Sequence, residues 1–351
     1  MHRKAETGIR LMLLIGSVLV GLFGMELGFR ALLRPELLLH WPNFILEERI
    51  DSTAVMDRLV PDRQLGWVGN PRYAVDGVSY DAQGYRTTPG PAAATLAEPP
   101  ILVVGDSYAH GDEVKDDETW PAQLQALVGR RVVNAAVTGY GLDQTVLRAE
   151  QAVARVKPAV LLLGFIADDV WRSERSRSWG AEKPYFDLVN GALVLRNVPV
   201  PPSPDPADTL SVWQQLFGHS LLINEIVSDM GWHEDWALDH VQVPGGQEGE
   251  RLACPLLRRV AALGLPTLVI AEYSPLIWMA PDDYVRERRR VTAHVLQCAT
   301  EAGLSTLDLH DTIDAAIRKQ GLESIYRGSH PSPAGTKLAA ERIAAQLARD
   351  R

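Results

Sequence analysis

The sequence predicts an α/β protein in which a five-stranded parallel sheet lies between two layers of helices, with a membrane-spanning helix in front. Two observations predict this architecture. From Ile101 onward, short apolar segments alternate with amphipathic segments of helical length. Near the start of the chain, Leu11 to Met25 form an uninterrupted run without charge. A chain of 351 residues with 46% hydrophobic content can bury a sizeable core around such a sheet.

The predicted strands are short and aliphatic, and the predicted helices repeat their apolar positions every three to four residues. The strands are Ile101–Val104, Val132–Ala136, Val160–Phe165, Thr267–Ala271 and Thr306–Leu309. The helices are Trp120–Leu127, Gln144–Ala154, Arg251–Leu263, Val285–Ala302 and Ala334–Ala348.

A long segment interrupts this alternation between the third and fourth strands. It runs for about 85 residues, far beyond a normal connection, which predicts an inserted cap at about 172–250. Its first part predicts a β-hairpin, because Tyr185–Val189 and Ala192–Leu195 flank Asn190-Gly191, a pair that tolerates the positive φ angles of a two-residue turn. An aromatic stretch follows, which forms either the core of a small subdomain or a substrate platform: Trp213, Phe217, Trp232 and Trp236.

The N-terminal region predicts a single-pass membrane anchor. Ile9 through Phe29 gives about 20 residues, the length that a bilayer core requires. The basic residues before it place the N-terminus in the cytoplasm and the rest of the chain on the periplasmic side of the inner membrane. An uncleaved anchor is favoured over a removed signal peptide, and a buried core helix is the alternative. The expected boundaries are a cytoplasmic tail at 1–8, the anchor at 9–30, an N-terminal segment with a Pro-rich linker (Pro89 to Pro100) at 31–98, and the main domain at 99–349.

Charge and cysteine content exclude some classes of function. The net charge is −9 with acidic and basic residues intermixed, which argues against a nucleic-acid partner. The two cysteines, Cys254 and Cys298, lie far apart and outside any metal-ligand spacing, so the sequence predicts no metal site. They are either two buried thiols or one disulfide.

A candidate nucleophile stands at the end of the first predicted strand. Ser107, in Gly105-Asp106-Ser107, lies at the carboxyl end of a parallel strand, where open sheets of this kind bind ligands. Gly105 permits a sharp turn. A bare Gly-Asp-Ser also occurs in ordinary turns, where Asp and Ser cap a helix.

A serine hydroxyl needs a base, and His330 is the best candidate. It lies in a turn-rich stretch from Gly328 to Gly335, just before the last predicted helix, from which a loop can reach the strand ends. His110 and His310 are weaker candidates.

The ordered set of segments resembles the SGNH/GDSL hydrolase superfamily, over about residues 99 to 349. The resemblance rests on Gly105-Asp106-Ser107, Val133 to Gly141, Leu163 to Val170, and His330-Pro331. Three further segments are similar to a membrane-anchored bacterial subgroup: Leu65-Gly66-Trp67, Gln83-Gly84-Tyr85-Arg86 and Lys183-Pro184-Tyr185-Phe186. The resemblance implies a flavodoxin-like α/β/α fold and the cleavage or transfer of acyl groups, with Ser107 and Gly139 donating backbone N–H groups to the oxyanion.

Two positions depart from the family pattern. The third segment normally presents an oxyanion-binding asparagine, and Asp168 stands there instead, a carboxylate that cannot donate a hydrogen bond. An aspartate two or three residues before the histidine normally orients it, and those places hold Gly328 and Arg327. A backbone carbonyl, or a carboxylate such as Glu323, Asp168 or Asp169, is then expected to orient His330.

The expected function is a serine-dependent esterase or O-acyltransferase that works through an acyl-enzyme on Ser107 and requires no metal or organic cofactor. The expected partners are an acyl ester carried by a polysaccharide, the cell wall or a lipid, and the membrane that holds the anchor. One alternative is a non-catalytic relative that binds glycans or serves in assembly. A phosphodiesterase or an unrelated α/β protein would need metal-ligand clusters or a phosphate loop, which the sequence lacks.

Overall fold

The structure is a computed structural model that describes residues 2–90, 98–246 and 248–349. The chain forms two compact units. Unit 1 comprises Met1–Val55 and Ser203–His240, and unit 2 comprises Met56–Pro202 and Val241–Arg351. The Pro-rich linker expected between Pro89 and Pro100 falls mostly on residues 91–97, which lie outside the described residues.

Unit 2 is built on a five-stranded sheet with the order β14-β13-β7-β5-β6. All neighbouring strands are parallel, as predicted. The strands are β5 (Ile101–Val104), β6 (Val132–Asn134), β7 (Val160–Phe165), β13 (Thr267–Ala271) and β14 (Ser305–Asp308). The predicted bounds of the first, third and fourth strands agree with those of β5, β7 and β13, and the other two differ by one or two residues at their ends.

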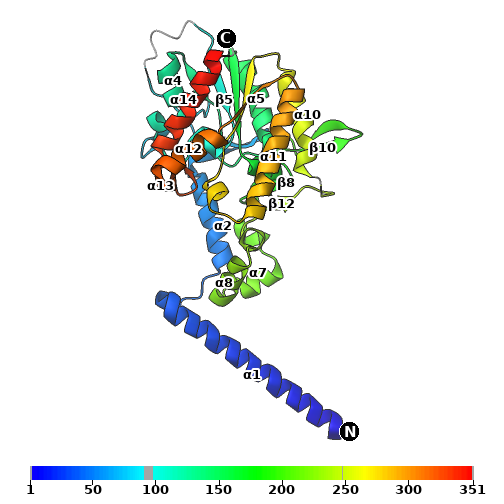
Figure 1. The fold of residues 1–351 in the computed structure, drawn as a ribbon. Helices are drawn as coiled ribbons and strands as arrows, with labels where there is room; N and C mark the ends of the chain where they lie inside the picture. Colours follow the sequence, from blue (N-terminus) through cyan, green and yellow to red (C-terminus); the bar gives the residue numbers. More distant parts are fainter. Residues whose placement is uncertain (1, 91–97, 247, 350–351) are drawn as a thin grey trace. The chain divides into compact units, whose positions relative to one another are not determined.

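Helices cover both faces of this sheet, so the unit has three layers (Figure 1). Alternate side chains of each strand point to opposite faces: Leu102 and Val104 pack in one core cluster, and Ile101 and Val103 pack in the other. The first cluster includes α5 (Leu142–Val156), α10 (Gly249–Ala261) and α11 (Asp282–Glu301). The second includes α4 (Trp120–Val128), α12 (His310–Gln320) and α14 (Pro333–Arg349). The α/β fold predicted from the sequence is confirmed.

Residues before the first sheet strand also belong to unit 2. They form the antiparallel pairs β1 (Leu59–Asp62) with β2 (Gly66–Gly69) and β3 (Ala74–Val75) with β4 (Val78–Ser79). The buried Trp67 donates from Nε1 to the carbonyl of Thr138 at 2.9 Å, and its own carbonyl accepts from Tyr140 Oη at 2.6 Å. The structure therefore places this part of the 31–98 segment in the same compact unit as the sheet.

The insertion is divided between the two units. Its flanking parts stay in unit 2 as a three-stranded sheet of β8 (Arg175–Ser178), β9 (Ala181–Glu182) and β12 (Val241–Gln242), and as the hairpin of β10 (Tyr185–Val189) and β11 (Ala192–Arg196). The predicted turn is present, because Asn190 and Gly191 both have positive φ, 51° and 80°. The middle part, Ser203–His240, belongs to unit 1 and contains α7 (Val212–Phe217), α8 (Leu221–Asp229) and α9 (His233–Ala237).

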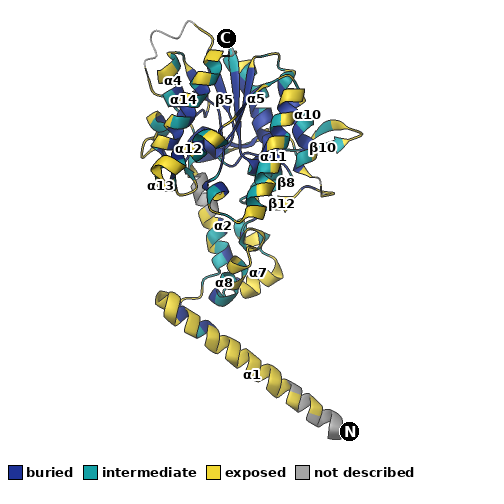
Figure 2. Ribbon diagram, viewed as in Figure 1, coloured by how far each residue is buried: buried dark blue, intermediate teal, exposed yellow. Residues whose placement is uncertain are grey.

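Unit 1 begins with the long helix α1 (His2–Leu33) and also contains α2 (Phe44–Ala54). The segment Met12–Leu33 of α1 has a mean hydropathy of 2.0 and is almost wholly exposed (Figure 2). By length and composition it can cross a membrane, and it fits a membrane anchor as well as a signal sequence.

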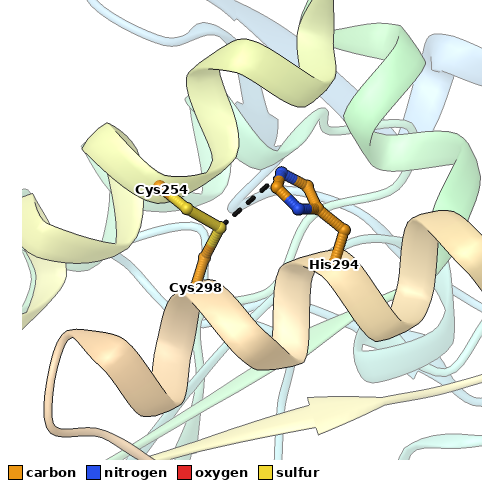
Figure 3. Close-up of side chains that lie close together, drawn as sticks. All are labelled: Cys254, His294 and Cys298. Carbon is orange, nitrogen blue, oxygen red and sulfur yellow. Dashed lines mark hydrogen bonds between the residues drawn. A yellow bond between two sulfur atoms is a disulfide. The ribbon is translucent and has the colours of Figure 1, made fainter.

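Cys254 on α10 and Cys298 on α11 are joined by a disulfide (Figure 3). The sequence left two alternatives, two buried thiols or one disulfide, and the structure contains the disulfide. The bond ties together two helices that cover the same face of the sheet.

Candidate active site

A tight turn positions Ser107 at the end of β5. Asp106 caps the short helix α3 (Ser107–His110) by accepting from the Tyr108 N–H at 3.0 Å. Gly105 is required in this turn, because a Cβ atom there would lie 2.7 Å from Ala109 Cβ and 2.8 Å from the carbonyl oxygen of Gly164. The side chain of Ser107 is thus held where the central strands of the sheet end.

His330 reaches Ser107 from a small antiparallel pair of strands. In this pair, β15 (Tyr326–Arg327) is joined to β16 (His330–Pro331) through Gly328, which has a φ of 58°. The Nε2 atom of His330 lies 2.9 Å from Ser107 Oγ, within hydrogen-bond distance. Tyr108 steadies the turn because its hydroxyl donates to the carbonyl of Ser329 at 2.6 Å. The two residues singled out from the sequence as nucleophile and base are brought together.

A carboxylate that the sequence analysis did not select lies on the other side of the imidazole. Glu113 Oε1 is 3.0 Å from His330 Nδ1, and the Ser329 hydroxyl lies 3.2 Å from the same nitrogen. Glu113 follows the helix α3 in a conformation with a φ of 66°, unusual for a residue other than glycine. Its side chain is 37% exposed. Ser107, His330 and Glu113 therefore form a continuous hydrogen-bonded chain.

Gly328, two residues before His330, leaves room for the carboxylate of Glu113. A Cβ atom on Gly328 would lie 2.9 Å from Glu113 Oε2. Glu113 thus fills the space beside the position that holds an aspartate in the family pattern. The only signal in the sequence is indirect: an acidic pair, Asp112-Glu113, close after Ser107, together with a glycine where the acid is missing.

The three carboxylates expected near His330 are engaged elsewhere or face solvent. Asp169 caps α6 (Ala167–Arg172), accepting from the Ile166 N–H at 3.1 Å, and also pairs with Arg172 at 2.6 Å. Asp168 pairs with Arg288 of α11 at 3.1 Å. Glu323 is exposed on α13 (Leu322–Ile325). The acid that contacts His330 comes from the loop that follows Ser107, and only the folded chain brings the two segments together.

Buried acidic groups lie close to Ser107. Burial raises the pKa of Asp106, against the lowering effect of Arg172, whose Nη1 lies 3.3 Å from Asp106 Oδ2. Burial and the nearby Asp106 raise the pKa of Asp169 well above its ordinary value, and the same two causes act on Glu272. Burial therefore makes these three carboxyl groups harder to ionise than they are in water.

Two backbone N–H groups expected at the oxyanion lie in neighbouring turns. Ser107 is the first residue of α3, so its N–H has no partner inside that helix. Gly139 lies in the loop after β6, which is fastened to the nucleophile's turn by the Val137 N–H donating to the carbonyl of Gly105 at 3.0 Å. Gly139 has a φ of 77°, and a Cβ atom there would lie 2.9 Å from the ring of Trp179.

The weaker histidine candidates have other surroundings. His110 is fully buried; its Nδ1 lies 2.6 Å from Asp112 Oδ1 and its Nε2 lies 3.0 Å from the Tyr80 hydroxyl. Burial lowers the pKa of His110 to about 4. His310 stacks on Trp278 with ring centroids 5.7 Å apart.

One group of possible metal-ligating side chains lies close together among the described residues. The donor atoms of Cys254, His294 and Cys298 lie within 4.8 Å of one another (Figure 3). His294 Nε2 lies 3.7 Å from Cys298 Sγ. Metal binding requires thiolates, and both sulfur atoms are occupied by the disulfide, so this group does not fit a metal as it stands.

Comparison with known proteins identifies one protein family. Residues 103–338 match the model of the GDSL-like lipase/acylhydrolase family. No curated protein matches the chain.

Similar solved structures include three hydrolase-type proteins with low sequence identity. A member of the lipolytic protein G-D-S-L family from Veillonella parvula is 13% identical, covering 71% of this chain and 98% of its own, with a TM-score of 0.43. LAE5, an α/β hydrolase enzyme from the metagenome of Lake Arreo in Spain, is 15% identical, covering 70% and 94%, with a TM-score of 0.45. Axe2, an acetylxylan esterase from Geobacillus stearothermophilus, is 16% identical, covering 71% and 94%, with a TM-score of 0.44.

The family match spans most of unit 2, from the first sheet strand into the last helix, and supports an ester hydrolase. The chain belongs to the GDSL-like lipase/acylhydrolase family.

Proposed function

We propose that this protein is a membrane-anchored serine esterase or O-acyltransferase in which Ser107 is the nucleophile and His330 is the general base. The observation that carries the proposal is the 2.9 Å distance between Ser107 Oγ and His330 Nε2, at the carboxyl end of the central strands. This distance lies within the range that proton transfer requires.

The reaction begins when His330 Nε2 takes the proton of Ser107 Oγ as the oxygen attacks the ester carbonyl. The carbonyl oxygen becomes an oxyanion, to which the N–H groups of Ser107 and Gly139 donate. As the tetrahedral intermediate collapses, the imidazolium returns the proton to the leaving alkoxide and an acyl-enzyme remains. A water molecule or an acceptor hydroxyl, deprotonated by His330, then attacks the acyl group, and the imidazolium returns this proton to Ser107 Oγ as the serine leaves.

Glu113 acts in this scheme as a positioning residue. Its carboxylate accepts from the His330 Nδ1–H at 3.0 Å, which leaves Nε2 unprotonated and directed at Ser107. The negative charge of Glu113 also stabilises the imidazolium that forms in the transition state. Because the side chain is 37% exposed, solvent screens part of this effect.

Asp168 makes the oxyanion site different from that of the family pattern. A carboxylate supplies no hydrogen-bond donor, and its negative charge opposes an oxyanion. The ion pair with Arg288 at 3.1 Å offsets that charge. With two donors instead of three, we expect turnover to be slow on simple esters and to depend strongly on how well the substrate fits.

The proposed setting is the periplasmic side of the inner membrane, with α1 as a single-pass anchor and its N-terminus in the cytoplasm. An apolar segment of this length and the basic residues before it support that topology. Such a setting favours acyl esters of glycans, of the cell wall or of lipids as substrates.

The changes at Asp168 and Gly328 favour a second candidate, a non-catalytic relative that binds glycans or serves in assembly. In that case the contact between His330 and Ser107 would be retained for structure alone. The two candidates differ in whether Ser107 reacts.

The test is hydrolysis of p-nitrophenyl acetate by the detergent-solubilised full chain, together with labelling of Ser107 by a fluorophosphonate probe. We expect turnover and labelling in the natural protein, and loss of both in Ser107→Ala and His330→Ala. Ser305→Ala is the matched control, because it removes an exposed hydroxyl at the start of β14, at the other end of the sheet from Ser107. A folded natural protein that neither turns over p-nitrophenyl acetate nor reacts with the probe would exclude a general esterase and favour the non-catalytic relative.

A further inference from the structure

The insertion in unit 1 is fastened to the end of the apolar helix α1 by buried charges. Glu26 of α1 accepts from the Ser220 hydroxyl at 2.8 Å and from the N–H groups of Leu221 and Leu222 at 2.9 and 3.0 Å, so its carboxylate caps the N-terminus of α8. One turn later, Arg30 of α1 is fully buried and donates to the carbonyl of His219. The connection between α7 and α8 is therefore held against the last turns of α1.

The position of these contacts along α1 sets the height of the insertion relative to a bilayer. Met12–Leu33 is the segment long and apolar enough to cross a membrane. Glu26 lies seven residues before Leu33, which corresponds to about 10 Å at about 1.5 Å per residue. If α1 spans the bilayer, the residues that bind Glu26 and Arg30 lie within about 10 Å of the outer end of the apolar segment, close to the boundary of the hydrocarbon region.

In the helix α7, which ends just before this connection, the apolar side chains are exposed and a polar side chain is buried. Val212, Trp213, Leu216 and Phe217 are 68%, 65%, 62% and 42% exposed. Gln214 is the buried residue of the helix, and its side chain donates to the Trp236 carbonyl at 2.8 Å. At about 100° per residue, the four apolar residues share one side of α7, facing away from Gln214.

The composition of this part of the chain indicates what can cover the apolar side. Residues 203–240 contain no Lys or Arg, so attraction to anionic lipid headgroups does not hold the insertion at a membrane. Trp213 and Phe217 stack with ring centroids 5.9 Å apart, and aromatic side chains favour the interface between lipid and water. Insertion of the apolar side of α7 into the boundary of a bilayer fits both the lack of basic residues and the exposed aromatic pair.

We propose that α7 is an interfacial helix that inserts its apolar side into the same bilayer that α1 spans. The inference rests on the proposed membrane anchor and is independent of the chemistry at Ser107. It assigns a second membrane contact to the middle of the insertion and explains why this part of the chain folds with the N-terminal helix.

The test places one fluorescent label at a time on the full chain in phosphatidylcholine vesicles. The labels are attached to Leu216→Cys on the apolar side of α7, Gln215→Cys on its polar side, Leu19→Cys within α1, and Val189→Cys in the hairpin of unit 2. These four residues are exposed, and the natural cysteines are bonded to each other. Quenching by spin-labelled lipids reports contact with the bilayer, and quenching by iodide reports contact with water.

We expect spin-labelled lipid to quench the labels at 19 and 216, and iodide to quench those at 189 and 215, with no change in 1 M salt. Iodide quenching at 216 with lipid quenching at 19 would overturn the inference, because α7 would then face water. Protection at 216 from both quenchers would also overturn it and indicate a protein on this side. Iodide quenching at 19 would also overturn the inference, because it would show that α1 does not span the bilayer. None of these readouts depends on ester hydrolysis.

Discussion

The carboxylate of Glu113 lies 3.0 Å from the Nδ1 atom of His330, although the two residues are 217 positions apart in the chain. The family pattern takes this acid from the turn that carries the histidine. Here it comes from the loop that follows the nucleophile, and Gly328 leaves it room. Variants that test this and other contacts are measured on the detergent-solubilised full chain.

Replacing Glu113 by glutamine should lower kcat by about 10²- to 10⁴-fold and leave KM nearly unchanged. The amide keeps the shape of the side chain but loses the charge that stabilises the imidazolium, and its N–H₂ can face Nδ1 and favour the wrong tautomer. Ester hydrolysis at varied substrate concentration gives both constants. Glu113→Asp should retain more activity than Glu113→Gln.

A rescue variant separates positioning from a structural effect. In Glu113→Ala the space beside Gly328 is empty, so adding Gly328→Asp supplies a carboxylate two residues before His330. Aspartate tolerates the positive φ at this position better than most residues. The double variant should be faster than Glu113→Ala alone. If Glu113→Gln has natural kcat, Glu113 does not position His330.

Replacing Asp168 by asparagine should raise kcat on short-chain esters by about 10-fold or more. In the proposed oxyanion site, the amide would supply a donor of the kind whose removal typically costs about 10² to 10³ in turnover, and it would remove a negative charge that opposes the oxyanion. Asp168→Ala is the control, which removes the charge without adding a donor and should be slower than Asp168→Asn. Equal rates for the two variants would show that position 168 does not face the oxyanion.

Reducing the disulfide should destabilise unit 2. The bond between Cys254 and Cys298 closes a loop of 44 residues, and loop closure of this size stabilises a fold by up to about 4 kcal/mol. Thermal unfolding with and without dithiothreitol measures the loss. In the double variant Cys254→Ser/Cys298→Ser, dithiothreitol should have no further effect, and an unchanged Tm in the natural protein on verified reduction would contradict the prediction.

The stability of unit 2 should fall as the pH is lowered from about 6.5 to about 4. Burial lowers the pKa of His110 to about 4, so in this range the unfolded chain takes up a proton that the folded chain refuses. The expected loss is about 1.4 kcal/mol per pH unit, about 3 kcal/mol over the whole window. Above about pH 6.5 both states hold His110 neutral, and this contribution is fully present.

Urea unfolding at several pH values measures this slope. His110→Gln should flatten it, because glutamine can still bond to Tyr80 and Asp112 but does not titrate in this range. An equal slope in the natural protein and in His110→Gln would show that other groups cause the pH dependence.

The sequence by itself determined the elements with strong local signals. The aliphatic runs that became β5, β7 and β13 are buried on both faces, and Asn190-Gly191 dictates its turn through the φ angles that it tolerates. The pairing of Ser107 with His330 could be predicted because Ser107 ends a parallel strand, and the turn-rich stretch that holds His330, just before the last helix, can reach the strand ends.

Only the tertiary structure decided which acid contacts His330, whether the cysteines pair, and which unit each part of the insertion joins. Each of these depends on contacts between segments far apart in the chain: Glu113 with His330, Cys254 with Cys298, and Glu26 with Ser220. A local pattern records the conformation that a segment prefers, but not its distance from another segment. That distance is set by the packing of the whole core, so it becomes known only when the chain is folded.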